Sequence, residues 1–588
     1  MNGFYGRILK IDLSRKSFAV DPVDDHVLQT YLGGKGLASH LLFTLNPPHV
    51  DATTPENCLI FATGPVGGSP VWGSSRYGVF TKSPLTGIYL ESYSGGKVPE
   101  AIDATGFDAV VISGQLTEPG VLSIHPDEVL FHDAADLWGQ ETFATEDAAL
   151  ERFGISGDAY KKPGAVVIGP ASENGVQFGI LANDYWRCAG RGGAGTVMGS
   201  KRLKAIVFQG DRKRKLFDAE AVSRMTKEMG KSAKDNPAAQ AYRSMGTTMM
   251  VDLLNSAGAF PTRYWSQGIC DHRDQINADA LHRRCSVKPH ACLKCFMACG
   301  RMTTLKQGRH AGLTLEGPEY ETIYAFGGLC MIDSIEEIVF LNDICDRLGM
   351  DTITAGNLCG LAIEAGRRGR IDMRIDYGDT DAIAGLLHAI ARREGIGHVL
   401  ACGIRHAAAA WGLEDVAVHV NGMEPPGYDP RVLKGMGLSY ATSDRGACHL
   451  RATFYKPELS GMIAPDQIQG KAEMFTDFED RLTLFDCLIL CRFYRDQYGW
   501  DALEKIVRAT TGLEMGKKAL QRVAGSVSTL VRRFNLREGL APKDDDRLPP
   551  RLHQPLETGQ VITEEELDRM LQDYYRLRGW QETGLPAD

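Results

Sequence analysis

The first part of the chain, residues 1 to about 210, alternates apolar and polar positions over short runs separated by Gly and Pro turns. A two-residue period is typical of strands with one buried face. It predicts strands at Arg7–Leu13, Asn57–Ala62, Asp108–Ser113, Gly164–Ile168 and Lys204–Gln209. A few helices are also predicted here, for example at Thr145–Phe153. This region is therefore expected to be β-rich.

The pattern changes after the charged stretch Asp211–Lys215, which we interpret as a solvated linker. A helical period then predicts helices at Ala219–Asn255, Ser334–Arg368, Thr380–Arg393, Lys471–Tyr494 and Met515–Phe534. A last helix is expected to start at Thr563, because Thr563 and Glu566 have the spacing of a capping box.

The pattern predicts an α+β protein with three domains. A Pro-rich break at Glu424–Gly427 divides the helical part, so we expect a β-rich domain over 1–211 and mainly helical domains over 212–424 and 425–588. No internal repeat is visible in the sequence.

Composition narrows the function classes. The net charge is -9 and no block of Lys and Arg is present, which argues against nucleic-acid binding. No run approaches the ~20 apolar residues of a membrane helix, and the N-terminus lacks the apolar core of a signal peptide. The 14 cysteines of this large chain are therefore expected to be thiols and metal ligands in the cytoplasm.

The sharpest local motif is Cys292-x2-Cys295-x3-Cys299. Compact spacing of this kind lets one loop hold three irons of a [4Fe–4S] cluster and leaves the fourth iron to a distant thiolate. A zinc site with His290 as a ligand is the alternative, although no second Cys or His pair is visible nearby. Spacing alone leaves four candidates for the fourth ligand, namely Cys285, Cys448, Cys487 and Cys491.

Glycine clusters between the predicted strands are candidate phosphate-binding loops. None matches a dinucleotide fingerprint or a P-loop, although Gly190–Gly195 comes close. Arg187 and Arg191 place fixed cations beside exposed amides there, which indicates a phosphate cradle of another kind.

Taken together, these segments resemble the aldehyde ferredoxin oxidoreductase family over nearly the whole chain. The resemblance is carried by GFYGRILKIDL, YLGGKGLA, SSRYGVFTKSPLTG, RCAGRGGAGTVMGSK, CLKCFMACGR, LEGPEYET, CDRLGMDT, YDPR, SDRGACHL and YYRLRGW. It implies a β-rich base domain for two pyranopterins, covered by two helical domains. It also implies tungsten (or molybdenum) between the two pterins, a bridging Mg²⁺ and one [4Fe–4S] cluster.

The resemblance assigns the cofactor-binding residues. The two family motifs align with Asp346–Asp351 and Asp486–Cys491, although Ile489 replaces a glycine in the second. This alignment makes Cys491 the fourth cluster ligand. The pterin and phosphate contacts are then expected from Arg76, Ser94, Gly95, Gly96, Arg187, Cys188, Gly190, Arg191, Asp346, Gly349, Met350, Asp351, Asp486 and Leu490. The backbone oxygens of Tyr93 and Cys188 are expected to bind Mg²⁺.

Two titratable residues match the family's active-site pair. Glu321 is expected to act as a base toward water or the hydrated aldehyde, and His449 to polarise the carbonyl. Considered without the resemblance, Glu321 would be a first-turn helix carboxylate and His449 a core histidine. The implied reaction is oxidation of an aldehyde to the carboxylic acid.

The sequence also suggests partners and alternatives. One cluster holds one electron, so electrons are expected to leave to ferredoxin or an iron–sulfur subunit. Some family members share a dimer-bridging iron held by Glu and His; here the aligned stretch is Phe340–Asp343, and no such iron is expected. The alternatives are a tungsten subunit of a benzoyl-CoA reductase-type complex and a non-catalytic iron–sulfur protein.

Overall fold

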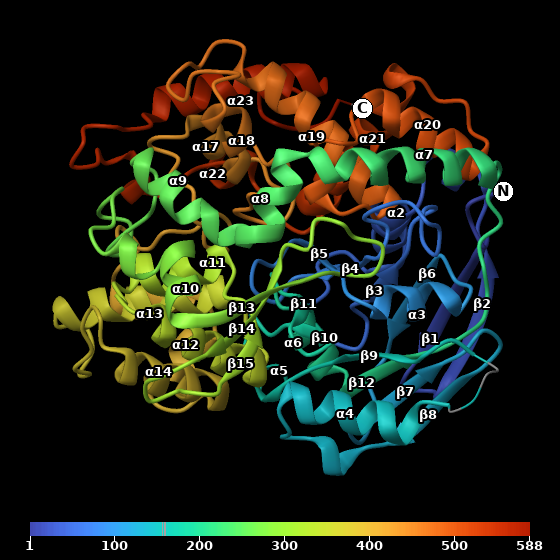
Figure 1. The fold of residues 1–588 in the computed structure, drawn as a ribbon, viewed down its shortest axis with the longest axis horizontal. Helices are drawn as coiled ribbons and strands as arrows, with labels where there is room; N and C mark the ends of the chain where they lie inside the picture. The colour runs from blue at the N-terminus through green and yellow to red at the C-terminus, as the bar shows by residue number, and fades with distance from the viewer. Residues whose placement is uncertain (156, 158–159, 588) are drawn as a thin grey trace.

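The computed structural model describes residues 1–155, 157 and 160–587 (Figure 1). Its first part contains two six-stranded sheets, and the rest is mostly helical, as predicted. The first sheet contains β1 (Arg7–Asp12), β2 (Ser17–Pro22), β3 (Leu59–Ala62), β4 (Tyr77–Lys82), β5 (Tyr89–Ser94) and β6 (Ala109–Ser113). The second contains β7 (Gly120–Ile124), β8 (Val129–Asp133), β9 (Gly164–Val167), β10 (Leu181–Asn183), β11 (Arg187–Ala189) and β12 (Leu203–Phe208).

The two sheets share one topology. The strand order is β2-β1-β6-β3-β4-β5 in the first sheet and β8-β7-β12-β9-β10-β11 in the second. In each sheet one pair is parallel, β1 with β6 and β7 with β12, and the other pairs are antiparallel. The structure therefore contains a repeat of chain path that was not visible in the sequence.

Alternation along the strands explains how the sheets pack. Leu59 and Phe61 of β3 and Ile206 and Phe208 of β12 point into a core shared by both sheets. The intervening residues face outward, so Ile60 packs under helices α2 (Gly34–Leu45) and α21 (Lys517–Arg537), and the outer face of the second sheet packs on α4 (Thr142–Phe153). The central strands are therefore buried on both faces, whereas the edge strands β2 and β8 are largely exposed.

The helical part surrounds the sheets on two sides, and α7 and α8 cross the front of the molecule (Figure 1). Its main helices are α7 (Ala219–Ser232), α8 (Pro237–Met245), α9 (Met250–Ser256), α10 (Ala278–Arg284), α12 (Ile335–Leu348), α13 (Thr352–Arg367), α14 (Thr380–Arg392), α15 (Ile396–Ala401), α16 (Ile404–Trp411), α17 (Lys434–Ala441), α18 (Tyr455–Leu459), α19 (Lys471–Leu488), α20 (Trp500–Thr511) and α23 (Glu564–Arg578). A small sheet of β13 (Cys285–His290), β14 (Gly300–Leu305) and β15 (Thr314–Glu316) adjoins them.

Three predicted helices are shorter than expected. The helix predicted over 219–255 breaks where Asn236 caps α8 and Pro237 opens it. The helix predicted over 334–368 is divided at Gly349 into α12 and α13. The helix predicted over 471–494 ends at Ile489. The capping box between Thr563 and Glu566 is present.

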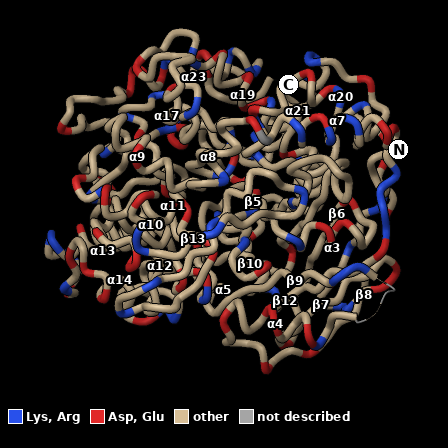
Figure 2. The backbone as a smooth tube through the Cα atoms, viewed as in Figure 1, with Lys and Arg blue, Asp and Glu red and all other residues tan. Residues whose placement is uncertain are grey.

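Basic and acidic residues are interspersed along the backbone over the whole fold (Figure 2). Within the described residues, no helix is both long and apolar enough to cross a membrane.

Candidate functional site

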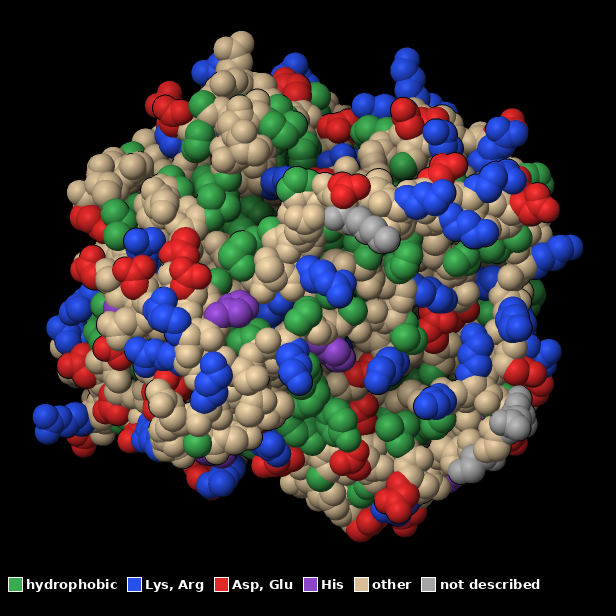
Figure 3. All heavy atoms as spheres, viewed as in Figure 1, with side chains coloured by type: hydrophobic (Ala, Val, Ile, Leu, Met, Phe, Trp, Pro, Cys, Tyr) green, Lys and Arg blue, Asp and Glu red, His purple; other side chains and the backbone are tan. Residues whose placement is uncertain are grey.

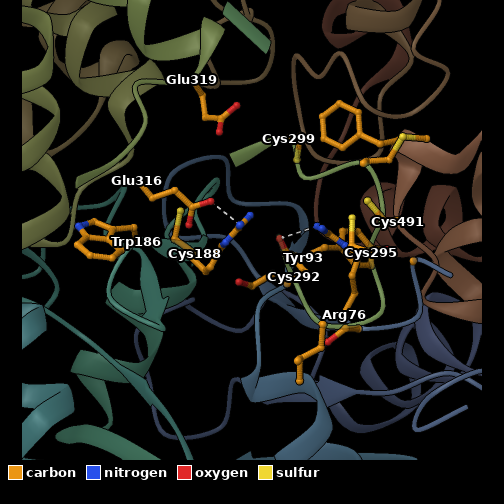
Figure 4. Close-up of a pocket in the computed structure, with 18 residues that line it drawn as sticks. Arg76, Tyr93, Trp186, Cys188, Cys292, Cys295, Cys299, Glu316, Glu319 and Cys491 are labelled. Atoms are coloured by element: carbon orange, nitrogen blue, oxygen red, sulfur yellow. Dashed lines mark hydrogen bonds and ion pairs between the residues drawn. The ribbon is translucent and has the colours of Figure 1, made fainter. Parts of the chain in front are cut away.

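Two neighbouring cavities lie where the sheets meet the helical part. The smaller has a volume of about 210 Å³ and contains the side chains drawn in Figure 4. The larger has a volume of about 370 Å³ and shares Arg76, Tyr93, Cys188 and Cys491 with the first. Every residue of the expected site lines one of the two cavities, except Gly96 and Gly349.

Four cysteines from two segments line the smaller cavity. Cys292, Cys295 and Cys299 lie on the loop between β13 and β14, and Cys491 follows α19 (Figure 4). Burial, and then the Cys491 thiol, raise the pKa of Cys295, which shows that thiols from the two segments lie close together. Among the described residues, no three His, Cys, Asp or Glu side chains converge tightly enough to ligate a single metal ion.

The other candidate thiols lie elsewhere. Cys285 is buried in the core of the helical part, and Cys487 is buried in the core beneath α19. Cys448 is also buried, with its sulfur 3.1 Å from Arg445 Nη2. None of the three lines the cavity that holds the other four cysteines.

The two family-like motifs are the C-terminal ends of two helices. Gly349 ends α12 and Ile489 ends α19, both in the left-handed region, at φ 79° and 59° respectively. The next residue in each motif donates its N–H to the carbonyl five positions back, Met350 to Cys345 at 2.9 Å and Leu490 to Phe485 at 2.7 Å. Ile489 therefore keeps the backbone of the glycine it replaces, at a cost of about 1–2 kcal/mol.

Each motif packs on an equivalent place in one sheet. Gly64, after β3, contacts the Leu488 carbonyl, and Gly169, after β9, contacts the Leu348 carbonyl. A Cβ at either glycine would lie 2.1 or 2.5 Å from that oxygen, so only glycine fits. The repeat thus brings one motif to each sheet.

The sixth residue of each motif completes this correspondence. The Cys491 N–H donates to the Gly73 carbonyl at 2.9 Å, and the Asp351 N–H donates to the Phe178 carbonyl at 3.2 Å. The two acceptors follow Gly64 and Gly169 by the same number of residues.

The glycine loop after β5 lies against the cysteine loop. A Cβ on Gly95 would lie 2.9 Å from Cys292 Sγ, and the Gly96 carbonyl accepts hydrogen bonds from Ser75 Oγ and the Leu293 N–H. Arg76 Nη2 donates to the Tyr93 carbonyl at 3.3 Å, a contact visible in Figure 4. Arg76 thus links the two cavities.

Arg187 and Arg191 lie on or after β11 and have different partners. Arg187 pairs with Glu316, whose other oxygen is 3.2 Å from His290 Nδ1. Arg191 pairs with Asp351 at 3.2 Å and donates to the Glu424 carbonyl at 2.8 Å. Arg191 therefore joins the first motif to the second half of the helical region.

The two motif aspartates are buried and differ in their partners. Asp346 accepts a hydrogen bond from Asn342 Nδ2 at 2.7 Å, and burial raises its pKa well above the ordinary range. Asp486 pairs with Arg492 and lies 3.3 Å from Arg451 Nη1. Asp486 therefore lies close to two guanidiniums, whereas within the described part of the chain no Lys or Arg nitrogen lies within 4 Å of the Asp346 carboxyl oxygens.

Glu321 and His449 face each other in the larger cavity. His449 Nε2 lies 3.6 Å from Glu321 Oε1, and the Gly427 N–H donates to Glu321 Oε2 at 3.0 Å. Burial raises the pKa of Glu321 to about 7. Burial, followed by the charges of Arg191 and other arginines, lowers the pKa of His449 well below its ordinary value. A neutral imidazole and a carboxyl that titrates near neutrality suit proton transfer.

A π-helical segment, Ile323–Leu329, begins two residues after Glu321. Segments of this kind often accompany functional sites. Around the pair, several buried polar atoms have no partner among the described residues: Glu321 Oε1, His449 Nδ1, Arg445 Nε, Arg451 Nε, Arg451 Nη2 and Arg492 Nε. Buried polar groups normally have partners, so this region fits a polar ligand.

Sequence reasoning missed several residues of the cavity walls: Trp186, Tyr242, Glu316, Glu319, Tyr428, Arg445, Tyr455, Arg492, Phe493 and Arg495. The clearest signal for these residues in the sequence was the pair Arg492 and Arg495, which lie one and four residues after Cys491 in an acidic chain.

The stretch considered for a dimer-bridging iron makes internal contacts. The Phe340 ring stacks on His310 with 3.9 Å between ring centroids, and Asp343 pairs with Arg347 at 2.7 Å.

Comparison with known proteins places the chain in a family. A family model described as "Aldehyde ferredoxin oxidoreductase, N-terminal domain" matches residues 8–210, and one described as "Aldehyde ferredoxin oxidoreductase, domains 2 & 3" matches 224–588. A tungsten-containing aldehyde ferredoxin oxidoreductase of Pyrococcus furiosus is 34% identical, over 99% of this chain and 97% of its own. The WOR-like subunit of an aliphatic sulfonate oxidoreductase, also of Pyrococcus furiosus, is 27% identical over 100% and 96%.

A solved structure has the same fold. It is the active-site complex BamBC of benzoyl-coenzyme A reductase with 1,5-dienoyl-CoA, with a TM-score of 0.86 and 22% identity, covering 100% of this chain and 96% of that one. The two family models together span nearly the whole sequence, and the similarity to the Pyrococcus furiosus enzyme is as extensive. The chain therefore belongs to the aldehyde ferredoxin oxidoreductase family of oxidoreductases.

Proposed function

We propose that this protein oxidises aldehydes to carboxylic acids at a tungsten, or molybdenum, bis-pyranopterin centre. The observation that carries the proposal is the Glu321–His449 pair, in a cavity that adjoins the four-cysteine cavity. The full-length similarity to a tungsten-containing aldehyde oxidoreductase supports the same reaction.

The residues present fit the proposed cofactor. Asp346 and Asp486 offer carboxylates to pterin amines at the ends of α12 and α19, and Arg76 lies between the two cavities. The glycine loops at Ser94–Gly96 and Gly190–Arg191 offer backbone amides to phosphates. The carbonyls of Tyr93 and Cys188 would bind Mg²⁺. When bound, the metal centre supplies two-electron oxidation and oxygen-atom exchange.

In this proposal the protein supplies the acid–base chemistry. Glu321 accepts a proton from water or from the hydrated aldehyde, since its pKa near 7 leaves it partly ionised at neutral pH. Neutral His449 carries one N–H and donates it to the carbonyl oxygen, which stabilises negative charge as it develops there. The Gly427 N–H fixes the Glu321 carboxyl in place.

Cys292, Cys295, Cys299 and Cys491 would hold a [4Fe–4S] cluster, which would supply an outlet for electrons. The cysteine loop reaches the surface, where Leu293 is 42% exposed. One cluster stores one electron and the oxidation releases two, so an external carrier, either ferredoxin or an iron–sulfur subunit, would dock beside this loop.

Two measurements test the proposal. Metal analysis of native protein should find tungsten or molybdenum with about four irons per chain. The purified enzyme should then reduce viologen with benzaldehyde. Turnover of a CoA thioester with a strong reductant, and none with aldehydes, would instead favour a benzoyl-CoA reductase-type subunit, whose fold this chain shares. Iron without tungsten or molybdenum would favour a simple electron carrier.

A further inference from the structure

A row of stacked rings runs along the wall of the larger cavity, away from the catalytic pair. His449 stacks on Tyr428 with 5.5 Å between centroids, and Tyr428 stacks on Tyr455 with 4.2 Å. Tyr455 opens α18, and Tyr242, on α8, lines the same cavity. Figure 3 shows a hollow edged by hydrophobic side chains between α8, α9 and α18, so this row leads toward the surface.

Arg495 lines the cavity and lies close to Tyr455 and Tyr242. Its residue is only 3% exposed, yet among the described residues no carboxylate oxygen lies within 4 Å of it. Its Nη1 donates to the Arg492 carbonyl at 3.1 Å, and its Nε has no partner. Tyr242 also hydrogen-bonds to this guanidinium.

The surrounding charges leave Arg495 available. Asp496 lies near Arg495, but its carboxylate pairs with Lys456 at the surface. Arg481 of α19 is also close to Arg495 and carries the same charge, so it cannot act as a counter-ion. By contrast, Arg191 and Arg492 in the same cavity each pair with a carboxylate. A buried guanidinium without a counter-ion is costly, and an anionic ligand would remove that cost.

The position separates Arg495 from the expected cofactor contacts. Those contacts gather at the motif ends and glycine loops. The ring contacts instead lead from His449 through Tyr428 to Tyr455, and Tyr455 lies close to Arg495. A substrate whose carbonyl meets His449 would therefore extend along these rings toward Arg495.

We propose that Arg495 binds a carboxylate at the far end of the substrate, so the preferred substrates are aldehydes that carry a remote carboxylate. This inference rests on the proposed function. In the reaction, the aldehyde C–H bond breaks and a water oxygen joins the carbonyl carbon. Two electrons pass to two one-electron acceptors, two protons are released, and the new acid loses a third.

The test compares two aldehydes of similar size, 4-carboxybenzaldehyde and 4-methylbenzaldehyde, with viologen as acceptor. The wild-type holoenzyme should favour the carboxylate, and Arg495→Gln should raise its KM roughly ten- to one-hundred-fold, the range expected for a lost charged hydrogen bond. The KM for 4-methylbenzaldehyde should change less than about threefold. Arg481→Gln, which removes a nearby charge outside the cavity wall, is the matched control and should leave both values unchanged.

Calorimetric binding of terephthalate to the oxidised holoenzyme gives a second measurement, independent of turnover. Aldehyde oxidation with no preference for the carboxylate and no terephthalate binding would overturn the inference and leave the proposed function intact. Terephthalate binding that is lost in Arg495→Gln, in an enzyme that oxidises no aldehyde, would support the anion site and overturn the proposed function. Equal losses with both aldehydes would show that Arg495 only supports the wall.

Discussion

Replacing Glu321 by Gln tests the proposed base directly. The substitution keeps the size of the side chain and its hydrogen bond with Gly427, but it removes the proton acceptor. General-base catalysis typically contributes about 10²–10⁴-fold, so kcat per bound tungsten should fall on that scale while metal and iron contents stay normal.

The pH dependence gives a sharper measure of the same group. With a pKa of about 7, Glu321 is ionised to about one tenth at pH 6 and about nine tenths at pH 8. The kcat/KM of the wild-type enzyme should therefore rise nearly tenfold between these pH values, because the ionised form is the base. The residual activity of Glu321→Gln should lack this rise.

The same pKa shift predicts an effect on stability. The pKa rises from 4.5 to about 7 on folding, so the folded state binds more protons between these values and stability falls as pH rises through that window. The loss amounts to about 3 kcal/mol and is complete above pH 7. Glu321→Gln should escape it and unfold at a higher temperature than wild type at pH 8, but not at pH 4. An unchanged pH–rate profile together with normal turnover would refute the assignment.

Three further outcomes are expected. His449→Ala should lower turnover per tungsten by roughly 10²–10³-fold, as for a lost oxyanion donor, with cofactor content unchanged; loss of tungsten instead would indicate a structural histidine. Cys491→Ser should reduce the iron bound per chain and abolish the cluster's electron paramagnetic resonance signal, whereas Cys487→Ser should leave both intact; the reverse pattern would exchange the ligands. The isolated chain with aldehyde should reduce viologen but not NAD, and rapid NAD reduction would contradict an external carrier.

Local pattern predicted much of the fold. Arg7–Leu13 and the other runs gave the centres of five strands within one or two residues, because these strands are short apolar segments between turn residues and are mostly buried. The predicted helices ran too far at Gly349 and Ile489. A helical period continues through these residues, but a left-handed backbone there ends the helix, and Ile489 carries no residue-type signal of such an end.

The candidate site was accessible from sequence only through the resemblance. Spacing alone found Cys292, Cys295 and Cys299 but left four candidates for the last thiol, since Cys491 reaches the cavity through the packing of α19 on the first sheet. The cavity wall formed by Tyr242, Tyr428, Tyr455 and Arg495 was not predicted, because these residues come from separate segments of the chain. The repeat also went unnoticed, because few residue types are shared between its halves, whereas the strand order and the backbone hydrogen bonds are equivalent.

The two motifs, one on each sheet, have equivalent backbone hydrogen bonds but carry different residue types at their sixth position. Asp351 and Cys491 occupy the same place in the two copies of the motif, yet Asp351 caps α13 and pairs with Arg191, whereas the Cys491 thiol faces the cysteine loop. In the proposed enzyme, only one of two otherwise matched half-sites is therefore joined to an electron outlet. In that enzyme, the residue at this position would decide which half-site passes electrons out.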